Sequence, residues 1–556
     1  MKILFEDYTY NAQDIPILEG IDLVEQKTGG VKLPYVGYYH DLASTEAIFI
    51  LPKVFIVKGL AFGHYQPEYL LSISDENKQL PHSDRSFLFG LSAWIYQAIA
   101  LYNERHTEDT ITSPRTLTGV IGRRGEGDAT LLDHILALLR FGKQHQSLFT
   151  YIATIMHSGQ HKVDWVKTIR STSPILKDRK PYYLDCKTKE KTINYDEELI
   201  CLFYSTLDYL KTSYCFVVKR NLNYKTEKSH RIADLINSGK GTKRLRKIRG
   251  KYFTDELVQL WNLLYAFYER AEAVAQKKVY NERLLVRNFN LVFEDMIDCL
   301  IGESSPPSEL KYQKDGKIVD HIYRDKSLIE DGEIYFIGDS KYYKEGNTMG
   351  KTARYKQFTY AKNIIQYNID LFNENQTQDL RYRDELTEGY NPTPNFFIRG
   401  FIDPDDLSYS DIKLTKEGSS DLNFHFKNRL FDRDTLLVLT YEINFLYVLS
   451  GYVLSRSTSS SINRFLRSKF RDDIIEAFEA KYDFYEVQPP HNISSEEFVK
   501  QNFYLLIGKI YKTSEGKLIL TLEKTGGEEN RELLALKHFV NDMTTEKLRS
   551  LSSITS

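Results

Sequence analysis

Two apolar segments joined by a short polar connection place the strongest constraint on how this chain can fold. Residues 317–324 and 333–343 are rich in β-branched and aromatic side chains, and Asp331-Gly332 between them favours a turn. The pattern predicts an antiparallel β-hairpin. Residues two apart on a strand point to the same face, so we expect Asp339 and Lys341 to share a face that Asp320, on the adjoining strand, can also reach.

This grouping of two carboxylates and one ammonium predicts a site for a hard divalent cation and a nearby water. Mg²⁺ prefers oxygen ligands and keeps several waters of its own, and Mn²⁺ is the alternative ion. We expect Asp320 and Asp339 to bind the metal, and Lys341 to orient the attacking water or to offset developing charge. An Asp-x-Lys pair on a strand is also a common exposed ion pair, so the flanking sequence has to decide between the two interpretations.

The segments on either side of the hairpin predict two helices and a strand. Upstream, apolar residues recur at helical spacing over residues 289–300. Glu294 lies beside this apolar stripe, and Asp298, one turn later, is an alternative carboxylate for the same place. Downstream, Gln357 lies in a second amphipathic helix, and residues 395–402 are expected to form a buried strand.

In this order, the acidic helix, the two strands, the Gln-containing helix and the apolar strand resemble the core of PD-(D/E)xK nucleases. The helix around Gln357 is similar to that of RecB-like and McrC-like members. The resemblance implies that Glu294 is a third carboxylate at the metal and that Gln357 is a catalytic residue that orients the group around it. The spacing from Gln357 to Tyr360 is one residue shorter than in those nucleases, which leaves the role of Tyr360 open.

Short phrases elsewhere resemble the LlaJI-type restriction endonuclease family, which is related to McrC. The resemblance spans roughly residues 30–455 and rests on Leu51–Phe55, Asp164–Ile169, Gly338–Tyr343 and Tyr355–Tyr360. It implies a Mg²⁺-dependent, type II-like restriction endonuclease subunit that hydrolyses double-stranded DNA in host defence. It also implies a separate McrB-like AAA+ GTPase as partner, which is consistent with the lack of a Walker A motif in this sequence.

Two alternatives to this function stay open. The first is a non-catalytic adaptor that keeps a nuclease-like fold and serves a motor protein, and it predicts no Mg²⁺-dependent nicking with any partner. The second is a nuclease that acts on structured DNA or RNA, which a comparison of duplex DNA, branched DNA and RNA as substrates would identify.

A dense run of cations is a separate candidate for contact with nucleic acid. Seven Lys and Arg residues lie within the twelve residues 240–251, and such local density suits a phosphate backbone, although a solvated helix face is the alternative. For Trp165, which has cations nearby, a buried structural side chain is favoured over a DNA or partner contact. The residues expected to bind DNA are Lys243, Arg244, Arg246, Lys247 and Arg249.

The length of the chain, 556 residues, is too great for a single compact core, and we expect a mixed α/β, multidomain protein. In the C-terminal part, a helix over residues 470–485 and strands over residues 503–523 are expected, with no recognisable chemistry. The glycine loop at residues 122–127 lacks the ending of a P-loop and is interpreted as an ordinary turn. The expected parts are a β-rich N-terminal region with a helix for partner or DNA contact (1–125), a mainly helical region (126–280), the nuclease core (281–405) and a C-terminal α/β extension (406–556).

Composition favours a soluble, cytoplasmic protein with no membrane partner. The 74 basic and 76 acidic residues nearly balance, so bulk charge does not indicate a polyanionic ligand. The four cysteines form no CxxC pair and are interpreted as reduced thiols, and the N-terminus lacks the apolar stretch of a signal peptide. The most apolar long window, residues 436–454, contains Glu442 and Asn444 and is therefore interpreted as a buried helix.

Overall fold

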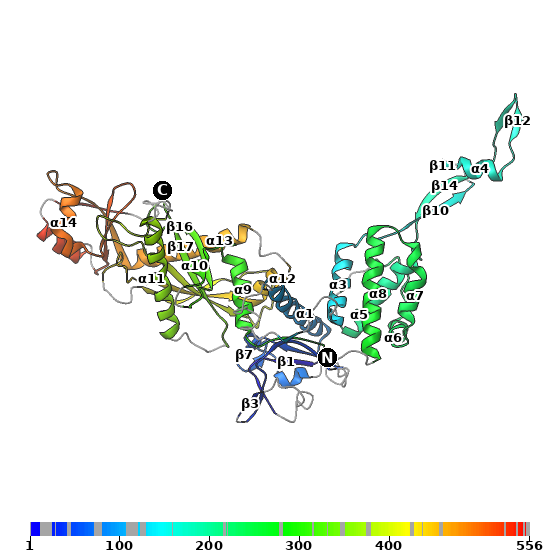
Figure 1. Ribbon diagram of the computed structural model, residues 1–556, viewed down its shortest axis with the longest axis horizontal. Coiled ribbons are helices and arrows are strands. Elements are labelled where there is room, and N and C mark those ends of the chain that lie inside the picture. Colours follow the sequence, from blue (N-terminus) through cyan, green and yellow to red (C-terminus); the bar gives the residue numbers. More distant parts are fainter. Residues whose placement is uncertain are drawn as a thin grey trace.

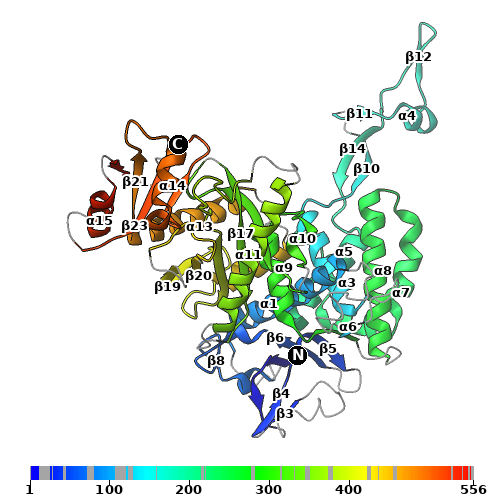
Figure 2. The same cartoon turned by 60° about the vertical axis from the view of Figure 1, so that its left-hand side comes forward.

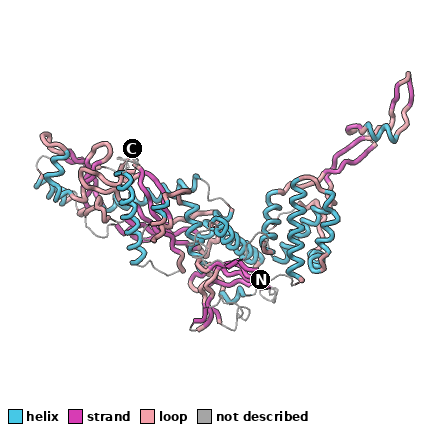
Figure 3. Tube along the Cα trace, in the orientation of Figure 1, coloured by secondary structure: helices cyan, strands magenta, loops and turns pink. Residues whose placement is uncertain are grey.

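The architecture of the computed structural model is mixed α/β, as expected. An N-terminal sheet and a central sheet lie side by side with their helices, while a helical bundle with a long projecting arm and a small C-terminal sheet lie at opposite ends of the molecule (Figure 1, and Figure 3 for the distribution of helices and strands). The described residues are 2–11, 25–27, 29–41, 46–71, 80–106, 121–122, 129–157, 160–214, 218, 221–276, 282–313, 316–330, 332–344, 351–373, 380–422, 428–435, 437–454, 460–526, 530–540, 543–548 and 551.

The N-terminal region is built on a five-stranded sheet that α1 (His82–Arg105) covers. Its strand order is β1 (Lys2–Phe5), β6 (Glu46–Leu51), β5 (Val36–Asp41), β15 (Glu282–Val286) and β9 (Ile121–Gly122). β15 pairs antiparallel with β5 although the helical bundle separates them in the sequence, so the bundle is inserted between strands of one sheet. The smaller elements here are β2 (Thr9–Tyr10), β3 (Glu25–Lys27), β4 (Gly30–Lys32), η3 (Lys53–Phe55), β7 (Ile56–Val57), β8 (Leu60–Ala61) and η4 (Pro67–Leu71).

The central sheet contains the predicted hairpin. Its order is β16 (His321–Lys326), β17 (Glu333–Lys341), β18 (Pro394–Phe401), β20 (Leu437–Asn444) and β19 (Thr415–Leu422). β16 pairs antiparallel with β17 from His321 opposite Gly338 to Lys326 opposite Glu333, which confirms the hairpin. β17, β18 and β20 are mutually parallel and almost entirely buried, as strands covered on both faces are.

Helices cover both faces of the central sheet, and two adjacent residues of β18 identify which helix lies on which face. The ring of Phe396 stacks on Phe470 of α13 with 4.6 Å between centroids, whereas Phe397 packs with Ala353 and Phe358 of α11. Because successive strand residues face opposite sides, α13 and α11 lie on opposite faces. The helices around the sheet are α9 (Phe289–Ile301), α10 (Ser308–Lys311), α11 (Lys351–Asn373), α12 (Phe445–Val453) and α13 (Ser460–Lys481).

The helical bundle carries an arm that extends far from the rest of the molecule (Figure 1 and Figure 2). The bundle contains α3 (Leu131–Gln144), α5 (Glu198–Tyr214), α6 (Ser229–Asn237), α7 (Lys240–Ile248), η5 (Arg249–Lys251) and α8 (Asp255–Ala275). The arm, residues 151–193, rises on the antiparallel pair β10–β14 and ends in a second hairpin. Its elements are β10 (Tyr151–Met156), β11 (Lys162–Val163), α4 (Trp165–Ser171), β12 (Ile175–Lys177), β13 (Lys180–Tyr182) and β14 (Thr188–Ile193).

The C-terminal region differs in part from the sequence expectation. The expected helix over residues 470–485 ends at Lys481, where β21 begins, and the first part of the expected strands over 503–523 belongs to a helix, α14. A four-stranded sheet has its own apolar core here. Its elements are β21 (Tyr482–Gln488), α14 (Ser495–Leu506), β22 (Ile510–Lys512), β23 (Leu518–Glu523), α15 (Arg531–Phe539) and β24 (Thr544–Lys547).

The most apolar window of the sequence is not a single helix, so the prediction for residues 436–454 is wrong in its first half. Residues 437–444 form β20, which pairs with β18 on one side and β19 on the other. Only the second half is helical, as α12, which Asn444 caps by accepting a hydrogen bond from Leu446 N at 3.0 Å. Among the described helices, none is long and apolar enough to cross a membrane.

Candidate active site

The hairpin brings the first two predicted ligands to the same end of the central sheet. Asp320 directly precedes β16, and the backbone N–H of Ser340 in β17 donates to Asp320 Oδ2 at 3.1 Å. Asp339 and Lys341 flank Ser340 and align with Phe397 and Arg399 of β18. Lys341 Nζ lies 5.6 Å from the centroid of the Phe397 ring, so Asp339 and Lys341 face the side that α11 covers.

Gly338 allows the strand to pass close to its neighbour immediately before these residues. A Cβ at this position would lie 2.2 Å from the ring of Phe396, which is far inside van der Waals contact. Any larger residue would push β17 away from β18 and displace Asp339, one position later.

Lys341 and Asp339 form an ion pair, with Lys341 Nζ donating to Asp339 Oδ1. The Asp339 side chain is 6% exposed and that of Lys341 is 17% exposed, so the pair lies at the surface of the fold with the carboxylate on its inner side. Asp320 and Glu294 are also partly exposed. The group is therefore accessible from solvent at its rim.

Glu294, on α9, lies close enough to Asp339 and Lys341 for their charges to change its pKa. Burial, together with the charge of Asp339, raises the pKa of Glu294 to about 7, against the lowering effects of a hydrogen bond from Asn290 and the charge of Lys341. Burial, followed by the charges of Asp339 and Glu294, also raises the pKa of Asp320 well above its ordinary value. Three carboxylates thus crowd around one cation, Lys341.

Gln357 is the fifth predicted residue and has an unusual environment. It lies on α11 with its side chain completely buried, and among the described residues neither its amide nitrogen nor its amide oxygen has a hydrogen-bond partner. Buried polar atoms are paired in most native proteins because an unpaired one costs free energy.

Tyr360, whose role the sequence left open, holds the segment that leads to Asp320. Its hydroxyl donates to the carbonyl oxygen of Ile318 at 3.0 Å. On the same stretch, Val319 N donates to Lys311 O at 3.0 Å. Tyr360 thus contributes to the placement of Asp320 from the α11 side of the sheet.

The donor set fits a hard divalent cation by its chemistry. As the side chains stand, no three His, Cys, Asp or Glu residues in the described part of the chain are arranged so that they could hold a metal ion. Burial and then repulsion by neighbouring carboxylates nevertheless raise the pKa of both Asp320 and Glu294, and a cation between carboxylates relieves such repulsion. All the acidic donors are oxygen ligands, which suit Mg²⁺ or Mn²⁺ once Lys341 releases Asp339.

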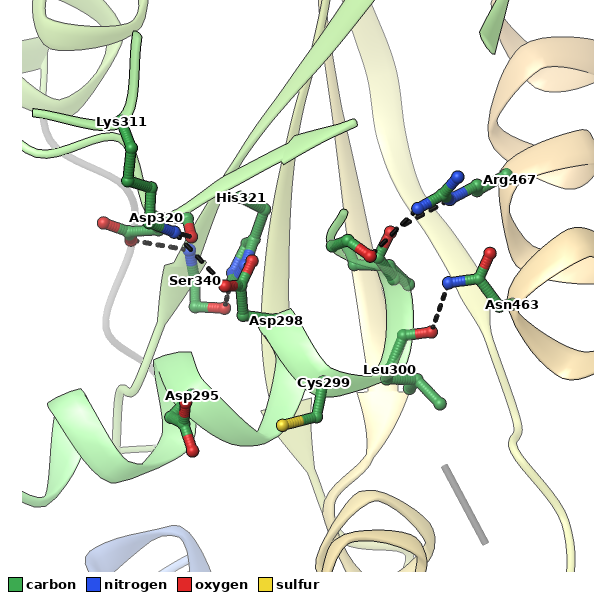
Figure 4. A network of polar contacts seen from close by, with 12 residues as sticks. Asp295, Asp298, Cys299, Leu300, Lys311, Asp320, His321, Ser340, Asn463 and Arg467 are labelled. Atoms are coloured by element: carbon green, nitrogen blue, oxygen red, sulfur yellow. Dashed lines mark hydrogen bonds and ion pairs between the residues drawn. The ribbon is translucent and has the colours of Figure 1, made fainter. Parts of the chain in front are cut away.

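Sequence reasoning missed a second polar group directly behind these residues (Figure 4). Ser340 Oγ lies 2.6 Å from His321 Nε2, and His321 Nδ1 lies 3.2 Å from Asp298 Oδ1. Asp298 was considered only as a substitute for Glu294, whereas it bonds to His321 and Lys311. The alternation of facing along the strands could have placed His321 and Ser340 together, but their partner on α9 requires the tertiary structure.

The predicted DNA-binding run is divided between structural and exposed cations. Arg244 pairs with Glu198 at 3.0 Å and Glu227 at 2.6 Å inside the bundle. Arg246 bonds to the hydroxyl of Tyr265, and Arg249 lies over the ring of Trp261 at 5.1 Å. Of the five residues expected to bind DNA, Lys243, Arg246 and Lys247 are exposed, and Arg244 and Arg249 are half-buried.

The interpretation of Trp165 as a buried side chain is wrong, because it is 56% exposed on α4 of the arm. The burial pattern of this helix is the reverse of the usual one. The small polar Thr168 is fully buried and bonds to the backbone of Lys187, while the apolar residues of the helix are exposed to solvent. The exposed large apolar side chains of the arm are Tyr151, Ile152, Ile155, Trp165, Val166, Ile169, Ile175, Leu176, Tyr182 and Leu184.

Comparisons with known proteins give little further information. No family model matches the sequence, and no curated protein matches it. The structure aligns with a chain from a solved assembly of Thermococcus gammatolerans McrB AAA+ hexamers with bound McrC. That alignment covers 82% of this chain and 98% of the other at 12% sequence identity, and its TM-score of 0.30 is too low to support an inference about fold or function.

Proposed function

We propose that this chain is a Mg²⁺-dependent endodeoxyribonuclease with a PD-(D/E)xK-like core, acting as a restriction subunit in host defence. The observation that carries the proposal is the meeting of Asp320, Asp339, Glu294 and Lys341 at the end of one hairpin. The mixed sheet, with helices on both faces and the unpartnered Gln357 amide on one of them, supports the same conclusion. Mn²⁺ is the alternative ion.

The chemistry assigned to these residues is hydrolysis of a phosphodiester. Asp320, Asp339 and Glu294 would hold the cation, which when bound supplies Lewis-acid polarisation of the scissile phosphate. A water gives up one proton as its oxygen forms a new bond to phosphorus, one P–O ester bond breaks, and the leaving oxygen takes up a proton, so the protons balance. The Lys341 ammonium is placed to orient that water and to offset the charge that develops on the phosphate. Gln357, buried on α11 at the face of the sheet where these ligands lie, is assigned to positioning the groups around the site.

The test of this assignment is cleavage of duplex DNA by single variants of the full chain. Asp339→Asn and Lys341→Ala should each lower cleavage by at least about a hundredfold, because each removes a group that acts on the reacting phosphate. Asp325→Asn and Lys326→Ala are the matched controls and should cleave normally, because the half-buried Asp325 and the exposed Lys326 lie at the end of β16 away from Asp320. Full cleavage by either site variant would refute the assignment. If the wild-type chain shows no cleavage with Mg²⁺, either alone or with a motor partner, the adaptor function is favoured instead.

The partner that we propose is a McrB-like AAA+ GTPase, since the sequence has no Walker A motif of its own. The arm supports a binding role, because apolar side chains exposed on a projecting element cost solvation until a partner covers them. Trp165→Ser with Ile169→Ser should leave the Tm unchanged and abolish co-purification with a McrB-like AAA+ protein. Lys177→Ser with Lys180→Ser, at the exposed tip, is the control pair.

A further inference from the structure

The residues that alternate with the proposed metal ligands are themselves hydrogen-bonded to one another. His321 follows Asp320, and Ser340 lies between Asp339 and Lys341. Because successive strand residues face opposite sides, His321 and Ser340 face away from the metal ligands, and there His321 Nε2 and Ser340 Oγ are 2.6 Å apart. This side-chain contact joins the two strands where the backbone pairing of β16 and β17 ends, since His321, opposite Gly338, is the last paired residue.

The orientation of the His321 ring is fixed by α9. Its Nδ1 lies 3.2 Å from Asp298 Oδ1, and a carboxylate only accepts, so Nδ1 carries a proton. The other carboxylate oxygen, Asp298 Oδ2, accepts from Lys311 Nζ at 3.3 Å. The same Lys311 ammonium also donates to the carbonyl oxygen of Asp320.

Both ends of this chain of hydrogen bonds terminate on Asp320 (Figure 4). At one end, Ser340 is held by its side chain and donates its backbone N–H to Asp320 Oδ2 at 3.1 Å. At the other end, Lys311 holds the carbonyl of Asp320. The carboxylate and the backbone of a single residue are therefore fixed through Ser340, His321, Asp298 and Lys311.

The same three side chains have the order of a Ser-His-Asp nucleophile, but burial excludes that role. Ser340 is 4% exposed and His321 is completely buried between the sheet and α9. A nucleophile needs a substrate carbonyl or phosphate within contact distance of its oxygen. The hydroxyl of Ser340 faces the interior of the fold and has no approach for a substrate.

We propose that Ser340, His321 and Asp298 are positioning residues that set the side chain of Asp320 for binding a divalent cation. The inference rests on the proposed function. At metal sites, residues that are hydrogen-bonded to the ligands hold those ligands in the orientation that binds the ion, and we assign this role to the three residues on the α9 side of the sheet. Loss of such residues typically weakens metal binding by about 10–100-fold. All three carboxylates remain in such variants, but Asp320 is no longer held in one orientation, so the loss appears in affinity for the ion and not in affinity for DNA.

The experiment measures Mn²⁺ binding to the full-length chain by titration calorimetry, alongside Tm and DNA binding in the absence of metal. Ser340→Ala should weaken Mn²⁺ binding by about tenfold or more, and Ser340→Thr, which keeps the hydroxyl, should restore it. Ser92→Ala is the matched control: it removes another fully buried hydroxyl, which donates to Leu88 O at 2.7 Å in α1. It should lower the Tm by a similar amount without changing Mn²⁺ affinity.

Asp298→Ala gives an independent variant should Ser340→Ala fail to fold, because Asp298 is partly exposed on α9. It should also weaken Mn²⁺ binding while DNA binding stays at the wild-type level. Wild-type Mn²⁺ affinity in both Ser340→Ala and Asp298→Ala would overturn the positioning role and leave the nuclease proposal intact. Absence of Mn²⁺ binding by the wild-type chain itself would instead overturn the metal site, and the inference with it.

Discussion

The hydroxyl of Tyr342 donates a hydrogen bond to the carboxylate of Glu6, and this contact joins the central sheet to the N-terminal sheet. Tyr342 is the residue after Lys341, and Glu6 is the residue after β1. The backbone N–H of Lys53 donates to both side chains, at 3.2 Å to Glu6 Oε2 and 3.0 Å to the Tyr342 oxygen. The N-terminal region is thus attached directly beside the proposed catalytic lysine.

Tyr342→Phe should destabilise the protein by about 1–3 kcal/mol, because it leaves the buried Glu6 carboxylate without one donor while the ring still packs on Phe289 and Phe293. Urea unfolding followed by tryptophan fluorescence measures the change. The control is Tyr504→Phe, which removes a hydroxyl from a residue that is 73% exposed and should change stability by less than about 0.5 kcal/mol. Equal effects of the two substitutions would contradict the structural importance of the contact.

Glu6 should make stability depend on pH between its ordinary pKa of 4.5 and its value in the folded protein. Burial raises the pKa of Glu6 to about 7, in spite of the lowering effects of Lys53 and Tyr342. Between these values the folded state binds more protons than the unfolded state, so stability falls as pH rises and the whole penalty is present above pH 7.

Glu6→Gln removes this titration and is the direct test. The variant and the wild type should have similar Tm values at pH 5, and the variant should be the more stable of the two at pH 8. A constant Tm difference at all pH values would show that Glu6 does not titrate in this range.

Glu294 should make cation binding depend on pH. Because its pKa is raised to about 7, Glu294 is mostly protonated at pH 6, and a cation has to displace that proton. Mn²⁺ affinity should therefore increase from pH 6 to pH 7 and level off by pH 8. Calorimetric titrations at the three pH values measure it, and Glu294→Gln should bind more weakly with a shallower pH dependence. An affinity of the wild type that is the same at pH 6 and pH 8 would contradict the assignment of Glu294 as a ligand.

Gln357→Leu should separate stability from activity. Leucine keeps a similar volume and removes two buried atoms that have no partner, so the Tm should stay the same or rise. DNA cleavage should fall by at least about tenfold, since the amide is assigned to positioning the groups around the site. The matched control is Asn368→Leu on the same helix. The side-chain nitrogen of Asn368 donates to Ile364 O at 2.8 Å, so the loss of this hydrogen bond should lower the Tm and leave activity unchanged.

Local sequence pattern was sufficient for the hairpin and for the facing of its residues. Two strand-like segments around a turn specify β16 and β17, and a period of two places Asp339 and Lys341 on one face whatever the rest of the chain does. Helical spacing likewise predicted α9 and α11. These features depend on neighbours within a few residues, which a sequence displays directly.

Tertiary structure decided the features that depend on distant partners. Residues 437–444 are as compatible with a buried helix as with a strand, and pairing with β18 and β19 makes them a strand. Trp165 is a large apolar side chain of the kind that usually lies in a core, yet it is exposed because its helix, α4, lies on the projecting arm. Asp298, His321 and Ser340 are joined only because α9 packs behind the hairpin. Sequence fixes which face a side chain takes on its own strand or helix, whereas burial, pairing and the raised pKa values arise from what packs against that face.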